Sequence, residues 1–222
     1  MGRSTAWDAA EVAESAWHAQ GLVVAGVDEV GRGCIAGPVT AGACILDWLK
    51  FLSLSDSDRA LIRDSKTLSL KQREYAKLVV LSVSKASSVA WAQADEIAAL
   101  GIVEATFLAM RRAISALTVT PDLIAVDGKF PITSLDIPQL AIIRGDSLVK
   151  AISAGAILAK CSRDAFMRSL ESRYPAYGFA HHVGYSTREH LDALAVHGPC
   201  AVHRFNFEPI RSMSLAVSQP QP

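Results

Sequence analysis

The sequence lacks the features that define several large classes of protein. Its four cysteines, Cys34, Cys44, Cys161 and Cys200, form no CxxC pair and no dense cluster, so neither a disulfide framework nor a cysteine zinc site is expected. Glycine and proline interrupt the longest apolar stretch, 33–46, which falls short of the roughly 20 residues that cross a bilayer. The sequence therefore predicts a cytoplasmic protein with reduced thiols and no membrane segment.

The chain also has no excess of charge of either sign. Its 22 Lys and Arg residues equal its 22 Asp and Glu residues, which excludes a globally basic protein that coats nucleic acid through nonspecific phosphate contacts. Equal totals still allow a local basic groove. With 222 residues, half of them apolar, the chain is long enough for one domain with a core and is not a disordered tail protein.

Short apolar, valine-rich runs alternate with helical patterns along most of the chain. Strands are expected at 22–30, 38–46, 87–94, 123–126 and 139–143. Helices are expected at 6–20, 69–83, 102–117, 147–173 and 187–197. Strands interleaved with helices, followed by helices alone, indicate an α/β domain with a C-terminal helical extension.

Four acidic residues stand out by their position at or near the ends of expected strands. They are Asp28, Glu29, Asp127 and Asp146. Converging carboxylates are the oxygen ligands that Mg²⁺ and Mn²⁺ prefer. Taken singly, Asp127 suits a turn and Asp146 suits a helix N-cap. The adjacent pair Asp28 and Glu29, on opposite faces of an apolar strand, has no structural use and favours a ligand site, because a buried carboxylate needs a cation or a donor.

A glycine-flanked arginine, Gly31-Arg32-Gly33, follows the acidic pair directly. The two glycines let backbone N–H and C=O groups approach a ligand without a Cβ in the way, and Arg32 can meet a phosphate. Alone, these three residues would be read as a tight turn between antiparallel strands. Directly after two acids, they indicate a ligand site.

Residues 26–38, GVDEVGRGCIAGP, resemble the signature of bacterial ribonuclease HII, the type 2 ribonuclease H family. The resemblance covers about residues 22–210 and continues through further motifs in the family's order. These are DSK at 64–66, VDG at 126–128, RGDS at 144–147, ISAGAILAKCSRD at 152–164, GYST at 184–187 and HRFNF at 203–207. The agreement is specific because no single motif carries it.

The resemblance implies a ribonuclease H-like fold, in which helices flank a five-stranded mixed sheet. It implies an endonuclease that hydrolyses the RNA strand of RNA/DNA hybrids. It also implies cleavage 5′ of single ribonucleotides embedded in duplex DNA, as a step in their removal. Nothing in the sequence demands more than a monomer. The expected division is a helical lead-in at 1–21, a catalytic domain at 22–174, a C-terminal helical segment covering the substrate groove at 175–212 and a frayed tail at 213–222.

The resemblance also assigns roles to individual residues. The catalytic, metal-binding acids are Asp28, Glu29, Asp127 and Asp146, which would hold two Mn²⁺ or Mg²⁺ ions. Such ions activate an attacking water and stabilise the leaving 3′-oxygen, so that hydrolysis leaves a 5′-phosphate and a 3′-hydroxyl.

Other residues are expected to bind the substrate. The family places Gly31, Arg32 and Gly33 at the ribose 2′-OH, which distinguishes RNA from DNA. It places Tyr185 beside the sugar at the RNA–DNA junction, where the ring would clash with a second 2′-OH. Lys66 is a candidate for a phosphate contact.

Two departures from the family pattern and two alternatives accompany this interpretation. Val183 replaces a frequent lysine, and Gly155 replaces the usual alanine at a cost of about 1 kcal/mol in helix propensity. One alternative is a ribonuclease HIII-type hybrid nuclease, which usually has an extra N-terminal domain and lacks this glycine–arginine–glycine arrangement. The other is a catalytically silent nucleic-acid-binding module, which predicts that at least one of the four acids is missing. None is.

Overall fold

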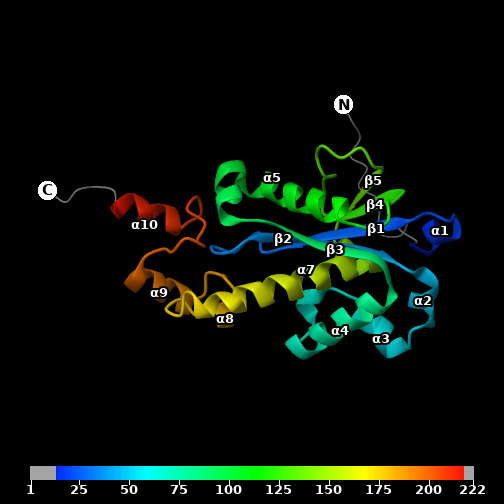
Figure 1. Cartoon of the computed structure of the whole chain (residues 1–222), viewed down its shortest axis with the longest axis horizontal. Helices are drawn as coiled ribbons and strands as arrows, with labels where there is room; N and C mark the ends of the chain where they lie inside the picture. The colour runs from blue at the N-terminus through cyan, green and yellow to red at the C-terminus, as the bar shows by residue number, and fades with distance from the viewer. Residues whose placement is uncertain (1–13, 218–222) are drawn as a thin grey trace.

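A computed structural model describes residues 14–217, with side chains to 213. Five strands form one sheet in the order β3-β2-β1-β4-β5 (Figure 1). They are β1 (Val24–Val30), β2 (Val39–Leu46), β3 (Ser84–Ala92), β4 (Leu123–Asp127) and β5 (Gln139–Ile142). The first three strands pair antiparallel, whereas β1, β4 and β5 run parallel. The predicted five-stranded mixed sheet is confirmed.

Helices cover both faces of the sheet (Figure 1). On one face lies α5 (Ala94–Ser115), which packs against β2 and β3 around a core that includes Ile97 and Met110. On the other face α7 (Lys150–Ser169) crosses β1 and β2, and α4 (Leu70–Val83) packs against α7. The sheet is therefore the middle of three layers, which buries both of its faces.

The other helices are short and lie at the periphery. They are α1 (Glu14–Ala19), α2 (Trp48–Ser53), α3 (Asp56–Leu61), η1 (Ser65–Thr67), α6 (Gly145–Leu148), η2 (Leu170–Ser172), α8 (Phe179–His182), α9 (Arg188–His197) and α10 (Ile210–Val217). Helices α8 to α10 lie together beyond one end of the sheet (Figure 1). Within residues 14–217, no helix is both long and apolar enough to span a bilayer.

Several helix boundaries differ from the sequence prediction. Helix α5 begins at Ala94, where Gln93 and Glu96 form a capping box, but Gly101 is non-helical, so the helix predicted from 102 corresponds to the segment of α5 after this kink. The single helix predicted at 147–173 is three elements, since Val149 is extended between α6 and α7. Helix α10 occupies the beginning of the tail that was expected to fray, and the parts of the two predicted ends at 1–13 and 218–222 lie outside the described residues.

Small residues let α7 lie directly on the sheet. A Cβ at Gly26 would run into the main chain of Ala151, and one at Gly42 would run into the carbonyl of Gly155. A Cβ at Gly155 would lie 2.7 Å from the Gly42 oxygen and 3.0 Å from the Gly26 oxygen. The usual alanine is therefore too large here, so Gly155 serves a close helix–sheet contact.

Replacing Gly155 by alanine is accordingly expected to destabilise the protein. The gain in helix propensity is about 1 kcal/mol, but overpacking against two main-chain oxygens costs about 1–3 kcal/mol. We expect a net loss of about 1 kcal/mol in urea unfolding. Ser162→Ala, at a half-buried position of the same helix, is the control and should not destabilise. A gain in stability for Gly155→Ala would contradict this packing argument.

Candidate active site

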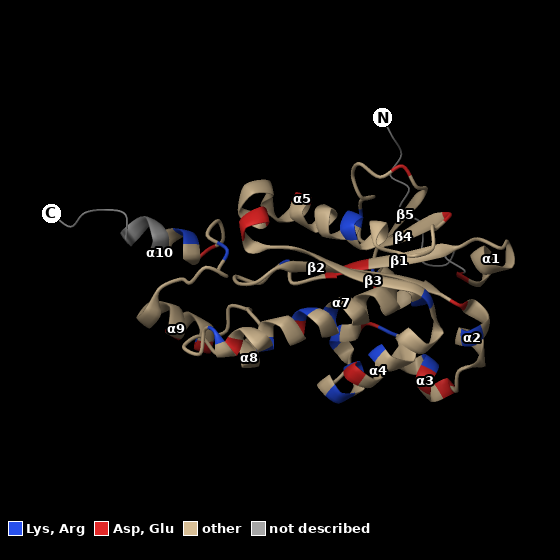
Figure 2. Cartoon of the chain, viewed as in Figure 1, with Lys and Arg blue, Asp and Glu red and all other residues tan. Residues whose placement is uncertain are grey.

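The sheet topology brings three of the predicted acids to one edge. Strands β1 and β4 are parallel neighbours with Val27 opposite Val126, so Asp28 and Asp127 follow side by side. Asp127 in turn lies opposite Ile142 of β5, and Asp146 follows in α6. The carboxyl ends of parallel strands share one edge of a sheet, and this edge carries the acids. In Figure 2, an acidic segment lies among the central strands, whereas most other charged residues lie on helices.

Asp28 is the most deeply buried of the four acids, with 4% of its surface exposed. It lies opposite Gly42, so its side chain is on the α7 face of the sheet. Its Oδ1 accepts a hydrogen bond from the Glu29 N–H at 2.6 Å. Burial raises the pKa of Asp28 well above its usual value, and the carboxylates of Glu29, Asp127 and Asp146 raise it further. The four acids therefore form one electrostatic cluster.

Glu29 and Asp127 have additional partners. Glu29 Oε1 lies 3.5 Å from Arg32 Nη1, and burial raises the pKa of Glu29 although Arg32 opposes the shift. Asp127 Oδ1 accepts a hydrogen bond from the Gly145 N–H at 2.7 Å. Burial and the Asp146 carboxylate raise the pKa of Asp127. Both acids line a pocket of about 150 Å³ between the sheet edge and α5.

Lys66 approaches the acids from a different part of the chain. It lies in the 3₁₀ turn η1, and the Asp64 carboxylate accepts a hydrogen bond from its backbone N–H at 2.9 Å. Burial disfavours the charge on Lys66, but the surrounding carboxylates together outweigh that effect and raise its pKa; they are Asp28, Asp146, Asp64 and Asp127. The structure thus brings Lys66 into the electrostatic field of the acid cluster.

The cluster fits divalent cations by its chemistry. Its four acids offer only carboxylate oxygens, and their mutual repulsion adds to burial in raising the pKa of Asp28 although Arg32 and Lys66 lie near the cluster. Within residues 14–217, no three His, Cys, Asp or Glu side chains are arranged to hold an ion as they stand. Glu29 and Asp127 are turned toward Arg32 and the Gly145 N–H.

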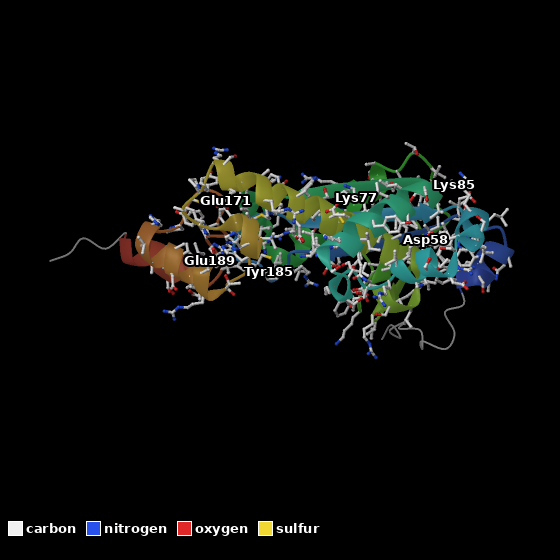
Figure 3. All side chains as sticks on the ribbon, turned by 90° about the horizontal axis from the view of Figure 1, so that it is seen from below. Asp58, Lys77, Lys85, Glu171, Tyr185 and Glu189 are labelled. Atoms are coloured by element: carbon white, nitrogen blue, oxygen red, sulfur yellow. The ribbon has the colours of Figure 1, made fainter. Side chains whose placement is uncertain are left out.

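The loop of Tyr185 adjoins the segment that follows the glycine–arginine–glycine turn. The Ile35 N–H donates to the Gly184 carbonyl at 3.0 Å, and Lys160 Nζ lies 5.6 Å from the centre of the Tyr185 ring. The ring is partly exposed, and burial of its hydroxyl raises the pKa of Tyr185. Figure 3 shows Tyr185 at the edge of the C-terminal segment, near Glu189.

Behind Tyr185 lies a buried chain of histidines that the sequence interpretation did not predict. His190 Nδ1 is 2.8 Å from the Tyr185 carbonyl, and its Nε2 is 3.0 Å from His203 Nε2. His203 Nδ1 accepts from the Cys200 N–H at 2.9 Å. A carbonyl only accepts, so His190 donates from Nδ1 and His203 donates from Nε2. Both rings are neutral in this arrangement, and they fix the Tyr185 main chain.

The thiols behave as the sequence predicts. All four cysteines are free, and Cys34, Cys44 and Cys161 are buried. Burial raises the pKa of Cys44 to about 12 and that of Cys161 to about 11. Neither thiol is a thiolate near neutral pH, so neither is an activated nucleophile there.

Comparison with known proteins agrees with the geometry. The family model for ribonuclease HII matches residues 25–210. The chain belongs to the ribonuclease HII family. The ribonuclease HII of Paracidovorax citrulli is 47% identical over 200 residues, covering 90% of this chain and 80% of that protein. That of Burkholderia ambifaria is 47% identical over 189 residues, covering 85% of this chain and 83% of that protein. As a family member, the chain is a ribonuclease H, a hydrolase.

Solved structures share the fold at lower identity. The ribonuclease H2 of Pyrococcus horikoshii superposes with a TM-score of 0.73 at 22% identity, covering 89% of this chain and 99% of that one. Bst-RNase HIII in complex with Mn²⁺ superposes with a TM-score of 0.65 at 15% identity, covering 90% of this chain and 71% of that one. Both support the ribonuclease H-like sheet, whereas the family assignment rests on the ribonuclease HII sequences.

Proposed function

We propose that this ribonuclease HII-family chain hydrolyses the RNA strand of RNA/DNA hybrids and cuts 5′ of single ribonucleotides embedded in duplex DNA. The products would carry a 3′-hydroxyl and a 5′-phosphate, and the reaction would serve ribonucleotide removal. The observation that carries the proposal is the cluster of four carboxylates directly beside the exposed Arg32-Gly33 turn. The acids proposed for hydrolysis thus adjoin the turn proposed to bind the ribose.

The four acids would hold two divalent ions, Mn²⁺ or Mg²⁺. Three observations support this assignment: the ligands are all oxygens, Asp28 is buried, and neighbouring carboxylates raise the pKa of Asp28 and of Asp127. Bound divalent ions supply activation of a water for attack and charge stabilisation of the leaving oxygen. Lys66 would contribute a fixed positive charge near the scissile phosphate, and Arg32 would pair with a phosphate when it leaves Glu29.

Recognition of the ribose would come from the main chain of residues 31–33. Arg32 and Gly33 are exposed, and a Cβ at Gly33 would meet nothing within 4 Å. Their N–H groups can donate to a 2′-oxygen, which DNA lacks. Tyr185 would stack on the sugar 3′ of the ribonucleotide, where an additional 2′-OH would clash with its ring.

This arrangement predicts a selective effect for Tyr185→Ala. Loss of the ring should lower kcat/KM on a duplex with one ribonucleotide by about tenfold or more, because one stacking contact is worth about 1–3 kcal/mol. The duplex Kd should change less. Tyr185→Phe keeps the ring and is the matched control, with kcat/KM close to wild type. Equal kcat/KM for Tyr185→Ala and wild type on this duplex would remove Tyr185 from junction recognition.

The assignment of the chain to ribonuclease HII sequences leaves the ribonuclease HIII-type alternative without separate support. All four acids are present, which argues against a silent binding module. Monomeric action in the cytoplasm, the domain division, and the role of residues 175–212 as a cover over the substrate remain predictions.

Substrate choice and product chemistry test the proposal directly. We expect cleavage of an RNA/DNA hybrid and of a DNA duplex with one ribonucleotide, and none of duplex RNA. Enzymatic end-labelling should find a 5′-phosphate on the ribonucleotide and a 3′-hydroxyl on the upstream DNA. A 2′,3′-cyclic phosphate product would instead show that the 2′-OH is the nucleophile and would contradict hydrolysis by water.

A further inference from the structure

Two arginines are completely buried without an acidic partner. Arg163 and Arg204 are both 0% exposed. Every hydrogen bond of their guanidinium groups, within residues 14–217, goes to a main-chain carbonyl. Burial and the neighbouring Arg163 lower the pKa of Arg204 to about 10, although it stays charged near neutral pH. A buried charge without a carboxylate is costly, so its placement calls for an explanation beyond packing.

The carbonyls that Arg204 holds belong to the turn beside the acids. Its Nη2 donates to Gly31 O at 2.7 Å, its Nη1 to Arg32 O at 2.9 Å and its Nε to Gly37 O at 2.9 Å. The backbone N–H of Arg204 also donates to Ile35 O at 2.9 Å. One side chain, about 170 residues away in the sequence, thus holds three carbonyls of the segment 31–37.

Arg163 holds the far end of the same segment. Its Nη2 donates to Ala36 O at 3.1 Å and its Nε to Pro38 O at 2.9 Å, while its Nη1 donates to Val183 O at 2.8 Å in the Tyr185 loop. Gly31 packs against Arg163, because a Cβ there would run into the guanidinium. Arg204 is the side chain that donates to the carbonyls of residues 31 and 32, and the Cys34 N–H also donates to Gly31 O at 3.3 Å, which closes the turn.

The geometry of the peptide bond determines where the N–H groups of Arg32 and Gly33 point. In a trans peptide, the C=O of one residue and the N–H of the next point opposite ways. Arg204 draws the carbonyls of Gly31 and Arg32 inward, so the N–H groups of Arg32 and Gly33 point away from it. Arg32 and Gly33 are exposed, and neither N–H has an acceptor among the described residues.

We propose that Arg204 is a positioning residue for 2′-hydroxyl recognition: by fixing the carbonyls of Gly31 and Arg32, it aims the next two N–H groups at the ribose 2′-oxygen. This inference rests on the proposed function. The planar fork of arginine suits the task because it donates to several carbonyls at fixed angles, whereas the lysine ammonium is a point donor on a flexible stem. Arg204→Lys should therefore retain the charge and lose much of the alignment.

The test compares binding of two DNA duplexes that differ by one 2′-hydroxyl, in EDTA so that binding is measured without added divalent ions. For the wild-type chain, the duplex with one ribonucleotide should bind more tightly than the all-DNA duplex. Arg204→Met should reduce this ratio of Kd values by about tenfold, the effect of about 1.4 kcal/mol, and Arg204→Lys should reduce it by less. Affinity for the all-DNA duplex should stay within about twofold, because that contact is mainly to phosphates.

A second readout separates alignment from general stability. In nitrogen-15 NMR spectra, Arg204→Lys should shift the amide signals of Arg32 and Gly33 while the protein remains folded. Arg59→Met is the matched control, since Arg59 on α3 also donates to a carbonyl, Leu52 O at 3.0 Å. That variant should change neither the Kd ratio nor the two amide signals.

The outcomes distinguish this inference from the proposed function. A wild-type Kd ratio of one would contradict recognition of the 2′-hydroxyl, and it would also contradict the role of Arg204 in that recognition. A wild-type ratio above one, retained in folded Arg204→Met and Arg204→Lys with unmoved amide signals, would overturn only the role of Arg204. If neither variant folds, Arg204 has a structural role alone and the inference fails.

Discussion

Asp28→Asn is expected to lower cleavage of a ribonucleotide-containing duplex by about a thousandfold or more, the scale of losing a central electrostatic group in an active site. Asp28 is the most buried acid, and its pKa reflects the three other carboxylates. An amide removes the negative charge that a divalent ion needs, while its oxygen can still accept the Glu29 N–H bond. Single-turnover kinetics with saturating Mn²⁺ or Mg²⁺ measure the effect.

The same substitution should leave the metal-free protein folded and slightly more stable. The charged form of Asp28 is disfavoured by burial and by its acidic neighbours, and the amide removes both penalties at neutral pH. Urea unfolding in EDTA checks this expectation. Asp95→Asn, an exposed acid in the first turn of α5, is the matched control and should keep wild-type turnover. Wild-type turnover in folded Asp28→Asn would require the metal assignment to be abandoned.

The histidine pair behind Tyr185 predicts the second large effect, a loss of stability in mild acid. Burial lowers the pKa of His190 to about 4 and that of His203 to about 4. The unfolded chain has ordinary histidine values near 6.5. Between these values the unfolded state binds more protons than the folded state, so stability falls as pH falls from about 6.5 toward 4 and levels off below. At about 1.4 kcal/mol per pKa unit, the full loss for each ring is about 3.5 kcal/mol, most of which is reached by pH 4.5.

Urea unfolding at pH 7, 5.5 and 4.5 measures this dependence. The acid cluster works in the opposite direction, because carboxyls with a raised pKa in the folded state favour folding as pH falls. The difference between wild type and His203→Gln isolates the histidine contribution. The glutamine amide can replace the Nε2 donor but does not titrate, so the acid-induced loss should shrink by about 3 kcal/mol or less. An unchanged pH dependence would show that the pair is not held neutral.

Much of the fold could be predicted because its signals are local. Valine-rich runs marked the strands, and the helix expected from 69 is α4, which Ser69 caps in the structure. Helices α2 and α3 were missed although Asp47 and Ser55 cap them. Each is only six residues long, too short to show a helical period in the sequence.

For the candidate site too, residues with a local signal could be predicted, whereas long-range contacts could not. Asp28 and Glu29 were visible because acids are costly in an apolar strand, and their separation onto opposite faces follows from the strand itself. The contacts of Arg204 and the cap that Glu14 provides for the N–H groups of Lys150 and Ala151 were not visible. These contacts join residues more than a hundred positions apart, and only the assembled fold brings them together.

The most direct test of the account is cleavage of a DNA duplex containing one ribonucleotide, measured with Mn²⁺, with Mg²⁺ and with EDTA. We predict a single cut on the 5′ side of the ribonucleotide with a divalent ion and none with EDTA. Equal cleavage in EDTA would contradict the assignment of the four carboxylates as metal ligands. No cleavage of this duplex under any condition, by folded protein, would contradict the proposed function at single ribonucleotides.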